Sequence, residues 1–397
     1  MSRRKILFLD VPFENESGGD KNRSRFLFHA LREKFDVDLI LISHEGASAR
    51  AAWTNFKPLA MLAPQPAPWP RPSAAPAFAA ADHGVFVSLL REKKFDAVFC
   101  RFTAGWELLR RVALTVPKTA VIVDEDMLSS RLAALSWAAN PCFKRRWFLF
   151  EKWKLQRFEK NLFREPWQFW FTNPAELAGV RDRIAPKPAA GEFVLVPNTL
   201  PRTAPITETE RKPVILFFGS MDSAANTDGF ALLADEVLPL VEAELKTRGV
   251  EVQVVGKNPP AHLRERVARS GTDRIKIIGG VNSIDRAIAE SLFVLLPLRI
   301  ASGTRTRILE AAAQRRAVVT TPIGAEGLDV AEATLIGRNA AELAAHTKRL
   351  LANPAEADAL GARLGERCVS LYAPEKVAAD LVSAVEIFIS RSKGAGQ

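Results

Sequence analysis

Two arginines near the end of an apolar run could bind a phosphorylated ligand in the stretch Phe293–Leu328. The apolar run ends at Pro297, a turn of small residues follows at 301–304, and a helical pattern then begins. A helix N-terminus offers unpaired backbone N–H groups and the positive end of the helix dipole, so it attracts phosphate. Arg305 and Arg307 oppose that dipole, and a bound anion would explain their place in the first turn. A solvated basic turn is the alternative.

Glu310 lies about two turns into the same predicted helix, after two apolar residues and before three alanines. A carboxylate in such surroundings needs a partner. An ion pair with Arg307 or a hydrogen bond with Gln314 would supply one from the protein, and sugar hydroxyls would supply one from a ligand. We also expect Ser302 or Thr304 to cap the helix.

Two arrays of alternating apolar runs and helical patterns must position these residues. The strands predicted for the first array cover residues 6–9, 37–42, 97–100 and 120–123. Those predicted for the second array cover residues 214–218, 252–255, 275–278, 293–296 and 318–320. Such alternation predicts an α/β fold of two doubly wound parallel sheets, with ligands at the carboxyl ends of the strands.

Three proline-containing or helical segments complete the organisation. Seven prolines between Pro58 and Pro76 indicate an ordered excursion within the first domain, with a flexible linker as the alternative. Residues 181–212, which include a short strand at 193–196, connect the two domains, and 340–390 reads as helices.

Composition narrows the class of protein. The 397 residues are 48% hydrophobic and 25% charged, which excludes a fully disordered chain and suits two domains. The three cysteines lack CxxC spacing, so they indicate a reducing cytosol rather than a disulfide framework or thiolate metal site. No apolar run is long enough to span a membrane. A net charge of +10 favours anionic partners.

The stretch Phe293–Leu328 resembles the donor-binding region of retaining glycosyltransferases of the GT-B fold, specifically family 4. Glu310 matches the second of two glutamates in the family pattern, which implies that it holds the ribose hydroxyls of a nucleotide sugar. Ser302 stands where the first glutamate would be. The resemblance implies two Rossmann-like domains facing across a cleft, and retaining transfer of a sugar from a nucleotide-diphosphate sugar.

Two further segments resemble the family. Residues 217–230, with Gly219 at the loop, are similar to the first strand, loop and helix of the donor domain, and 196–201 is similar to the segment that closes the first domain. Ser220 and Asp228 stand where many members carry an arginine and a lysine on the diphosphate.

The donor phosphates therefore need other positive groups. We expect Arg305 and Arg307 to supply the charge, together with the turn Ser302, Gly303 and Thr304. Arg305 would then have a catalytic role, because it would stabilise the charge that develops on the departing diphosphate.

The N-terminal domain would bind the acceptor. Gly18 and Gly19 follow the first predicted strand and Arg23 opens the next helix, so the resemblance places them near the acceptor and the donor phosphates. A flexible surface turn is the alternative for the glycines.

Family members often have a histidine at the end of a central strand, where this chain has Asp124 and Asp126. Either aspartate could orient the acceptor hydroxyl or act as base, and capping of the next helix is the alternative. The pair superficially resembles a metal-binding DxD motif of another transferase fold, but GT-B enzymes usually need no metal. We expect neither a metal nor a cofactor.

The segment Cys142–Phe171 mixes aromatic and basic residues. Lys144, Arg145 and Arg146 open it, and the mixture could place a helix on an anionic membrane surface. A long domain helix that buries its aromatic side chains is the alternative. No recognition module accompanies the segment, so we expect no nucleic-acid partner.

These observations predict a glycosyltransferase with an acceptor domain at 1–200, a donor domain at 213–375 and a C-terminal helix at 376–397 that could pack back on the first domain. The expected partners are a nucleotide-sugar and a glycan or lipid-linked acceptor. The expected location is the cytoplasm, with optional peripheral association at the inner face of the membrane. A sugar-nucleotide epimerase of the same fold and a non-enzymatic basic polymer-binding protein stay open as alternatives.

Overall fold

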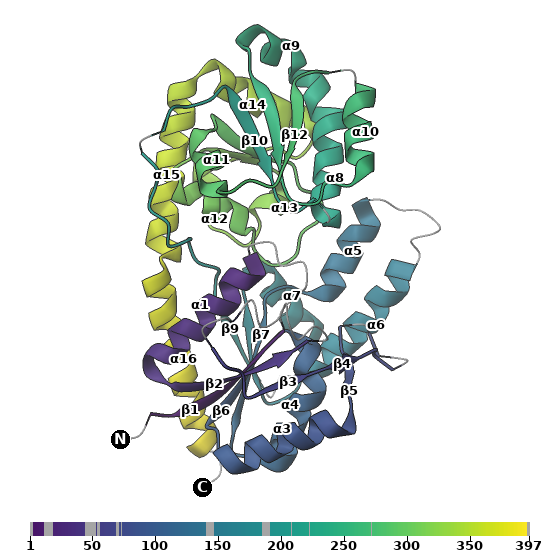
Figure 1. Ribbon diagram of the computed structural model, residues 1–397, viewed down its shortest axis with the longest axis vertical. Coiled ribbons are helices and arrows are strands. Elements are labelled where there is room, and N and C mark those ends of the chain that lie inside the picture. Colours follow the sequence, from purple (N-terminus) through teal and green to yellow (C-terminus); the bar gives the residue numbers. More distant parts are fainter. Residues whose placement is uncertain are drawn as a thin grey trace. The chain divides into compact units, whose positions relative to one another are not determined.

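Seven parallel strands form the sheet of an N-terminal unit, in the order β3-β2-β1-β6-β7-β8-β9 (Figure 1). They are β1 (Lys5–Asp10), β2 (Asp36–Ile42), β3 (Ala60–Leu62), β6 (Ala97–Arg101), β7 (Ala120–Glu125), β8 (Gln168–Phe171) and β9 (Glu192–Leu195). The helices that lie wholly or partly in the unit are α1 (Gly19–Lys34), α3 (Ala80–Lys93), α4 (Trp106–Thr115), α5 (Ser129–Ala139), α6 (Trp147–Leu162), α7 (Pro174–Ile184) and α16 (Pro374–Gly394). Residues 135–139 of α5 and Pro374 of α16 are assigned to the second unit.

The second unit carries a six-stranded parallel sheet in the order β12-β11-β10-β13-β14-β15. Its strands are β10 (Val214–Phe218), β11 (Glu251–Val255), β12 (Ile275–Gly279), β13 (Phe293–Leu296), β14 (Val318–Thr320) and β15 (Leu335–Ile336). Its helices are α8 (Ala224–Leu232), α9 (Leu238–Arg248), α10 (Ala261–Ser270), α11 (Ile284–Glu290), α12 (Thr306–Ala313), α13 (Pro322–Ala325), α14 (Ala340–Ala352) and α15 (Pro354–Tyr372), with a π-helical turn (Leu233–Val237) between α8 and α9.

This computed structural model describes residues 3–11, 19–43, 53, 56–68, 71–72, 74–139, 147–184, 191–207, 209–221, 223–270 and 272–394. The first unit comprises 1–134, 144–197 and 375–397, and the second comprises 135–143 and 198–374. Both sheets have the strand order of a doubly wound fold, which confirms the predicted fold class. In each sheet the order reverses beside the first strand, at β1/β6 and at β10/β13, where ligands of such folds bind.

The last helix of the chain belongs to the first unit. Val377, Leu381 and Val385 of α16 share a buried core with Ile6 and Phe8 of β1. Figure 1 shows α16 beside α1 and the β1–β2 part of the sheet. The first unit is therefore built from both ends of the chain.

Strand positions agree with the sequence analysis within one or two residues, but some elements differ. β8 lies in the aromatic segment and was not expected. The described part of the proline-bearing excursion is ordered, since β3 pairs with β2, and β4 (Pro64–Gln65) pairs with β5 (Ala77–Phe78). Among the helices described, none has the length and apolar character needed to cross a bilayer.

Candidate functional site

The carboxyl edge of the second sheet carries a glycine loop at its reversal point. Gly219 directly follows β10 and has φ of +148°. A Cβ atom there would lie 2.7 Å from Asn226 Nδ2 and 2.9 Å from Arg307 Nη1. Asn226 Nδ2 donates a hydrogen bond of 2.6 Å to the carbonyl oxygen of Ser220, which fixes the loop. Only glycine fits this conformation and this spacing, so the backbone at 219–220 stays accessible to a close ligand.

The turn before α12 lies at the same edge and is buried. Ser302 and Thr304 are only 6% and 7% exposed, and Asn198 Nδ2 donates a 2.7 Å hydrogen bond to Thr304 Oγ1. The N-cap residue of α12 is Arg305, and no side chain caps this helix. The prediction that Ser302 or Thr304 caps it was wrong, because the helix starts one residue later and Thr304 is bound to Asn198. Gly303, with φ of +69°, makes the turn.

Arg307 joins α12 to the glycine loop. Its Nη1 donates a 2.9 Å hydrogen bond to the carbonyl oxygen of Phe218, the last residue of β10. Burial and the neighbouring charge of Arg305 lower the pKa of Arg307 to about 10, so it is still a cation at neutral pH. The structure thus brings Arg307 to Gly219, with the charge of Arg305 close enough to act on Arg307.

Glu310 is partly buried and has no partner for its carboxylate. Within the part of the chain that the structure describes, Glu310 makes no hydrogen bond and no ion pair. Gln314 instead accepts a 2.9 Å hydrogen bond from the Ile206 amide. Neither protein partner that the sequence offered, Arg307 or Gln314, is therefore used. Burial raises the pKa of Glu310 to about 7, although Arg307 opposes the shift.

An arginine–aspartate ion pair at this edge was not predicted from the sequence. Arg299 follows β13 and binds Asp228 through Nε at 3.1 Å and Nη2 at 2.9 Å. Asp228 is the residue that replaces the lysine of the resemblance, and Arg299 neutralises it. Arg299 could have been noticed as a basic residue, since it lies in the same stretch as Arg305. Its ion pair with Asp228 of α8, about seventy residues earlier, cannot be read from the sequence.

In the first unit, Asp124 is held by two arginines at the ends of β6 and α1. Arg23 binds both carboxylate oxygens, with Nη2–Oδ1 at 2.5 Å and Nε–Oδ2 at 3.0 Å, and Arg101 Nη1 also donates to Oδ2. All three side chains are buried. Burial would raise the pKa of Asp124, but Arg23 and Arg101 outweigh it and hold the pKa below its usual value. Asp124 is thus placed as an anchor for two arginines rather than as a base.

The same arginine ties α1 to the end of the unit. Arg23 also donates to the carbonyl oxygens of Val196 at 3.1 Å and Pro197 at 3.2 Å. Its guanidinium is therefore committed to protein partners, although the sequence analysis assigned it to the acceptor. Gly19 is the first residue of α1, and Gly18 lies outside the described residues.

Asp126 is held less tightly by Arg23 and Arg101 than Asp124 is. It lies 3.8 Å from Arg23 Nε and 3.8 Å from Arg101 Nη2, a looser contact than that of Asp124. The next helix, α5, receives its N-terminal acceptors from Glu159, which binds the Ser130 amide at 3.0 Å. Asp124 is bound by Arg23 and Arg101 instead, and for Asp126 the capping of this helix stays an alternative. No metal-binding group of three His, Cys, Asp or Glu side chains occurs in the described ranges.

Comparison with known proteins supports the likeness of this architecture to glycosyltransferases. Residues 212–353 match the family model described as glycosyl transferases group 1. No curated protein matches the sequence significantly.

Solved structures match almost the whole chain. A sucrose-phosphate synthase from Thermosynechococcus elongatus is 14% identical with a TM-score of 0.68, covering 98% of this chain and all of that one. Anabaena HepE in complex with UDP and glucose is 13% identical with a TM-score of 0.66, covering 96% and 99%. An S. aureus TarM mutant with Fondaparinux, alpha-GlcNAc-glycerol and UDP is 11% identical with a TM-score of 0.67, covering 97% and 99%. The chain therefore has the GT-B fold of these proteins, and its second unit matches the group 1 glycosyltransferase family.

Proposed function

We propose that this protein transfers a glycosyl group from a nucleoside-diphosphate sugar to a hydroxyl group of a glycan or lipid-linked acceptor. The observation that carries the proposal is Glu310, a partly buried carboxylate near Arg307 that makes no hydrogen bond or ion pair with the described residues. A buried carboxylate without partners is costly, and two ribose hydroxyls would satisfy it. The UDP in the titles of the HepE and TarM structures makes UDP-sugars the first donors to test.

The proposed donor chemistry follows from the groups around α12. The sugar–phosphate bond breaks, and negative charge develops on the diphosphate oxygen that leaves. Arg305, Arg307 and the uncapped amides of α12 supply positive charge for it. Arg307 is held against β10 and keeps its cation there before the donor binds.

The proposed acceptor chemistry uses the first unit. The acceptor oxygen forms a bond to the anomeric carbon on the face from which the diphosphate leaves, so the configuration is retained. The hydroxyl proton passes to the leaving phosphate oxygen. We assign Asp126 to orient this hydroxyl, since Asp124 is bound by Arg23 and Arg101.

Thermal stabilisation by a panel of nucleotide sugars tests the proposal. A ligand at one hundred times its dissociation constant adds about 2.7 kcal/mol to the free energy of unfolding, which is readily measured. At least one nucleotide sugar should stabilise the wild type, and the Glu310→Ala variant should lose most of that effect. Glu366→Ala, which removes an exposed glutamate of α15, is the matched control and should behave as wild type.

Product analysis then separates the proposal from its competitors. Nucleoside diphosphate should be released faster when a glycan acceptor is present. Epimerised nucleotide sugar formed without acceptor would identify another reaction on the same fold. Absence of any nucleotide-sugar binding, with salt-dependent binding to anionic polymers, would overturn the enzyme proposal.

A further inference from the structure

Helix α6 exposes large apolar side chains in its first two turns and buries two carboxylates, the reverse of an ordinary surface helix. Its first two turns carry four large apolar side chains that are between 39% and 55% exposed: Trp147, Leu149, Phe150 and Trp153. On the opposite side, Glu151 and Glu159 are only 3% and 2% exposed. We call the four exposed side chains the α6 aromatic face.

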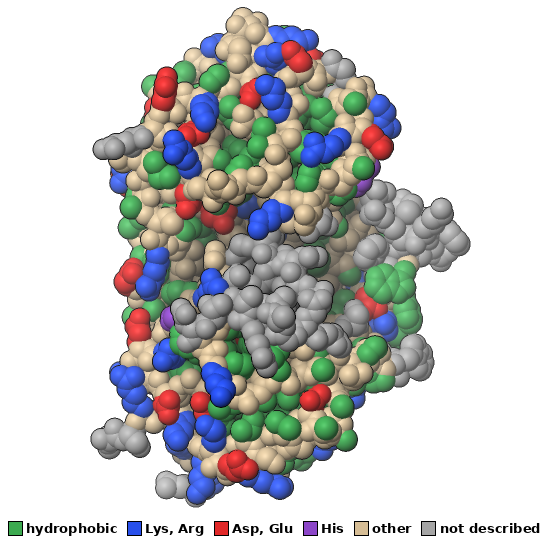
Figure 2. Space-filling view, viewed as in Figure 1, with side chains coloured by type: hydrophobic (Ala, Val, Ile, Leu, Met, Phe, Trp, Pro, Cys, Tyr) green, Lys and Arg blue, Asp and Glu red, His purple; other side chains and the backbone are tan. Residues whose placement is uncertain are grey.

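Contacts among these residues hold the aromatic face in place. The rings of Phe150 and Trp153 stack with their centroids 6.0 Å apart and an interplanar angle of 22°. Lys154 Nζ lies 5.4 Å from the Phe150 ring centroid and forms a 2.6 Å ion pair with Glu151. Glu159 binds Ser130 of α5 and Arg183 of α7, which fixes α6 on its buried side, while the Phe150 and Trp153 rings stay exposed. Figure 2 shows hydrophobic side chains gathered at the edge of the molecule where Figure 1 draws α6.

Cations continue from the aromatic face along the same helix. Lys152, Arg157 and Lys160 form no ion pair with any residue that the structure describes. Arg157 and Lys160 are exposed on the turns that follow Trp153. The basic residues Lys144, Arg145 and Arg146, which the sequence analysis singled out, lie outside the described residues.

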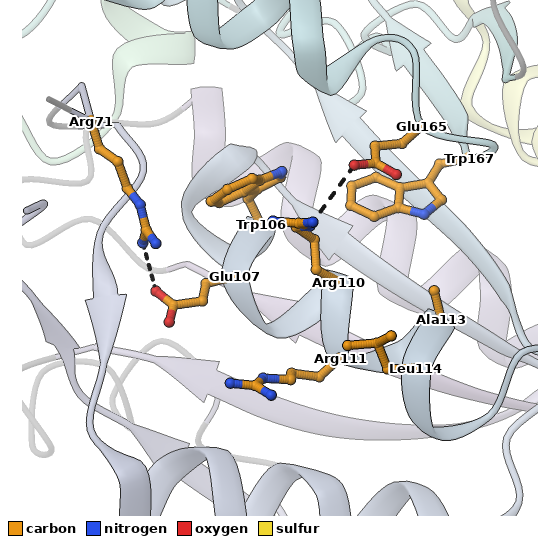
Figure 3. Close-up of a pocket in the computed structure, with 9 residues that line it drawn as sticks. All are labelled: Arg71, Trp106, Glu107, Arg110, Arg111, Ala113, Leu114, Glu165 and Trp167. Carbon is orange, nitrogen blue, oxygen red and sulfur yellow. Dashed lines mark hydrogen bonds and ion pairs between the residues drawn. The ribbon is translucent and has the colours of Figure 1, made fainter.

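An adjoining groove extends this basic surface. Trp106 of α4 contacts Phe158 of α6 with ring centroids 5.3 Å apart. Beside it is a groove of about 360 Å³ whose lining includes Arg71, Arg110 and Arg111 (Figure 3). Arg71 is paired with Glu107 at 2.8 Å, whereas Arg111 has no ion pair among the described residues.

We propose that the α6 aromatic face binds the interfacial layer of an anionic lipid bilayer, with the basic side chains of α6 on the lipid headgroups. Tryptophan and phenylalanine with flanking lysine and arginine suit this layer, where rings enter the acyl boundary and cations reach the phosphates. The net charge of +10 acts in the same direction. This inference goes beyond the proposed transferase activity, and its test does not depend on that activity.

Sedimentation with vesicles tests the inference. The full chain is mixed with vesicles of equal parts phosphatidylcholine and phosphatidylglycerol, and with vesicles of phosphatidylcholine alone. Wild type should sediment with the anionic vesicles. The double variant Phe150→Ser, Trp153→Ser should bind at least about tenfold more weakly. The triple variant Lys152→Gln, Arg157→Gln, Lys160→Gln should bind roughly a hundredfold more weakly at low salt, at about fivefold per cation.

Two matched control variants test whether the loss of any exposed apolar or basic side chains would weaken vesicle binding equally. Leu240→Ser, Val369→Ser removes two exposed apolar side chains of the second unit, and both residues are as exposed as the aromatic face. Arg91→Gln, Lys118→Gln, Arg248→Gln removes three exposed cations elsewhere. Both control variants should bind vesicles within a factor of about three of wild type, since only scattered surface groups are lost.

Several outcomes would overturn the inference. One is a wild type that does not sediment with anionic vesicles, or an aromatic double variant that binds as tightly as wild type. Another is light scattering that shows a wild-type dimer dissociated by the double variant, which would assign the face to a second copy of the chain. Loss of single-stranded RNA binding in the same variants, without vesicle binding by wild type, would assign it to nucleic acid.

Discussion

Glu310 is the residue of the proposed donor site whose ionisation near neutral pH is most affected by its surroundings. Its pKa is raised from the ordinary 4.5 to about 7, with burial as the main cause. An acid whose pKa is raised by folding stabilises the folded state while it is protonated, and that stability is lost as pH rises through the folded pKa. Ionised Glu310 therefore lowers the free energy of unfolding as pH rises through neutrality, until a ligand supplies hydrogen bonds to the carboxylate.

Glu310→Gln should reveal this strain. The amide keeps the shape without the charge, so it should leave the free energy of unfolding nearly unchanged at about pH 5 and raise it by about 1–3 kcal/mol at about pH 8. Urea unfolding of both proteins without ligand at the two pH values measures the difference. A difference that does not change with pH would contradict the elevated pKa.

Arg305→Ala should separate recognition of the diphosphate from recognition of the nucleoside. Loss of one charge-assisted hydrogen bond should weaken nucleoside-diphosphate binding by about 1.5–3 kcal/mol and bare nucleoside binding far less. Calorimetric titration with both ligands measures this, with Arg264→Ala on α10 as a control for lost surface charge. Equal losses for the two ligands would show that Arg305 does not read the diphosphate.

Groupings of site residues that are close in the sequence could be predicted, and pairings between residues far apart in the sequence could not. Arg305, Arg307 and Glu310 are neighbours on one helix, so their grouping is visible in the sequence. The pairing of Asp124 with Arg101 depends on the register of two adjacent strands, and this pairing is what turns the expected base into an anchor.

At the scale of elements, the Asp124 cluster fixes helix α1 on its sheet. Asp124→Asn would remove the carboxylate that both buried arginines bind, and would leave Arg23 and Arg101 with Asp126 at 3.8 Å. Breaking a buried ion pair on one side costs about 3–5 kcal/mol, so the variant should lose about that much stability. Urea unfolding measures the loss, and Asp126→Asn, which removes a carboxylate 3.8 Å from both arginines, is the comparison. Equal stabilities for Asp124→Asn and wild type would show that the cluster does not anchor α1.

The predicted elements that proved right and wrong differ in their surroundings. Buried strands such as β10 and β13 are short unbroken apolar runs, so their positions follow from composition alone. β8 has the sequence QFWF inside a segment rich in aromatic and basic residues, and nothing local separates it from the preceding helix. The start of α12 moved because Asn198, about a hundred residues earlier, binds Thr304.

At the scale of the whole molecule, the first unit depends on residues 374–397 at the end of the chain. Removing Pro374–Gln397 would expose the core around Ile6 and Phe8 that α16 covers. The buried face of α16 includes several large apolar side chains, each contributing about 1.5–3 kcal/mol, and the total approaches the stability of a typical domain.

The truncated chain should therefore unfold its first unit and keep its second. Hydrogen exchange measures this, since amides of β1 and β2 should lose protection while those of β10 and β13 keep it. Retained protection in β1 would show that α16 is dispensable for the first unit.

The overall organisation could be predicted because each unit repeats one rule, a buried strand followed by a helix. The packing of α16 on the first unit depends on contacts between its apolar residues and strand β1, which lies at the other end of the sequence. The sequence therefore indicated this packing as one possible arrangement and could not establish it. The outward aromatic face of α6 was equally ambiguous in the sequence. Its opposite side buries glutamates whose partners, such as Arg183, lie on another helix.

The central claim, that Glu310 holds the ribose of a nucleotide, is tested most directly by comparing ribose and 2′-deoxyribose nucleoside diphosphates. Wild type should prefer the ribose form by roughly tenfold or more, the value of one charge-assisted hydrogen bond, and Glu310→Ala should lose most of that preference. Equal affinity of wild type for the two ligands, or full preference retained in Glu310→Ala, would contradict the account.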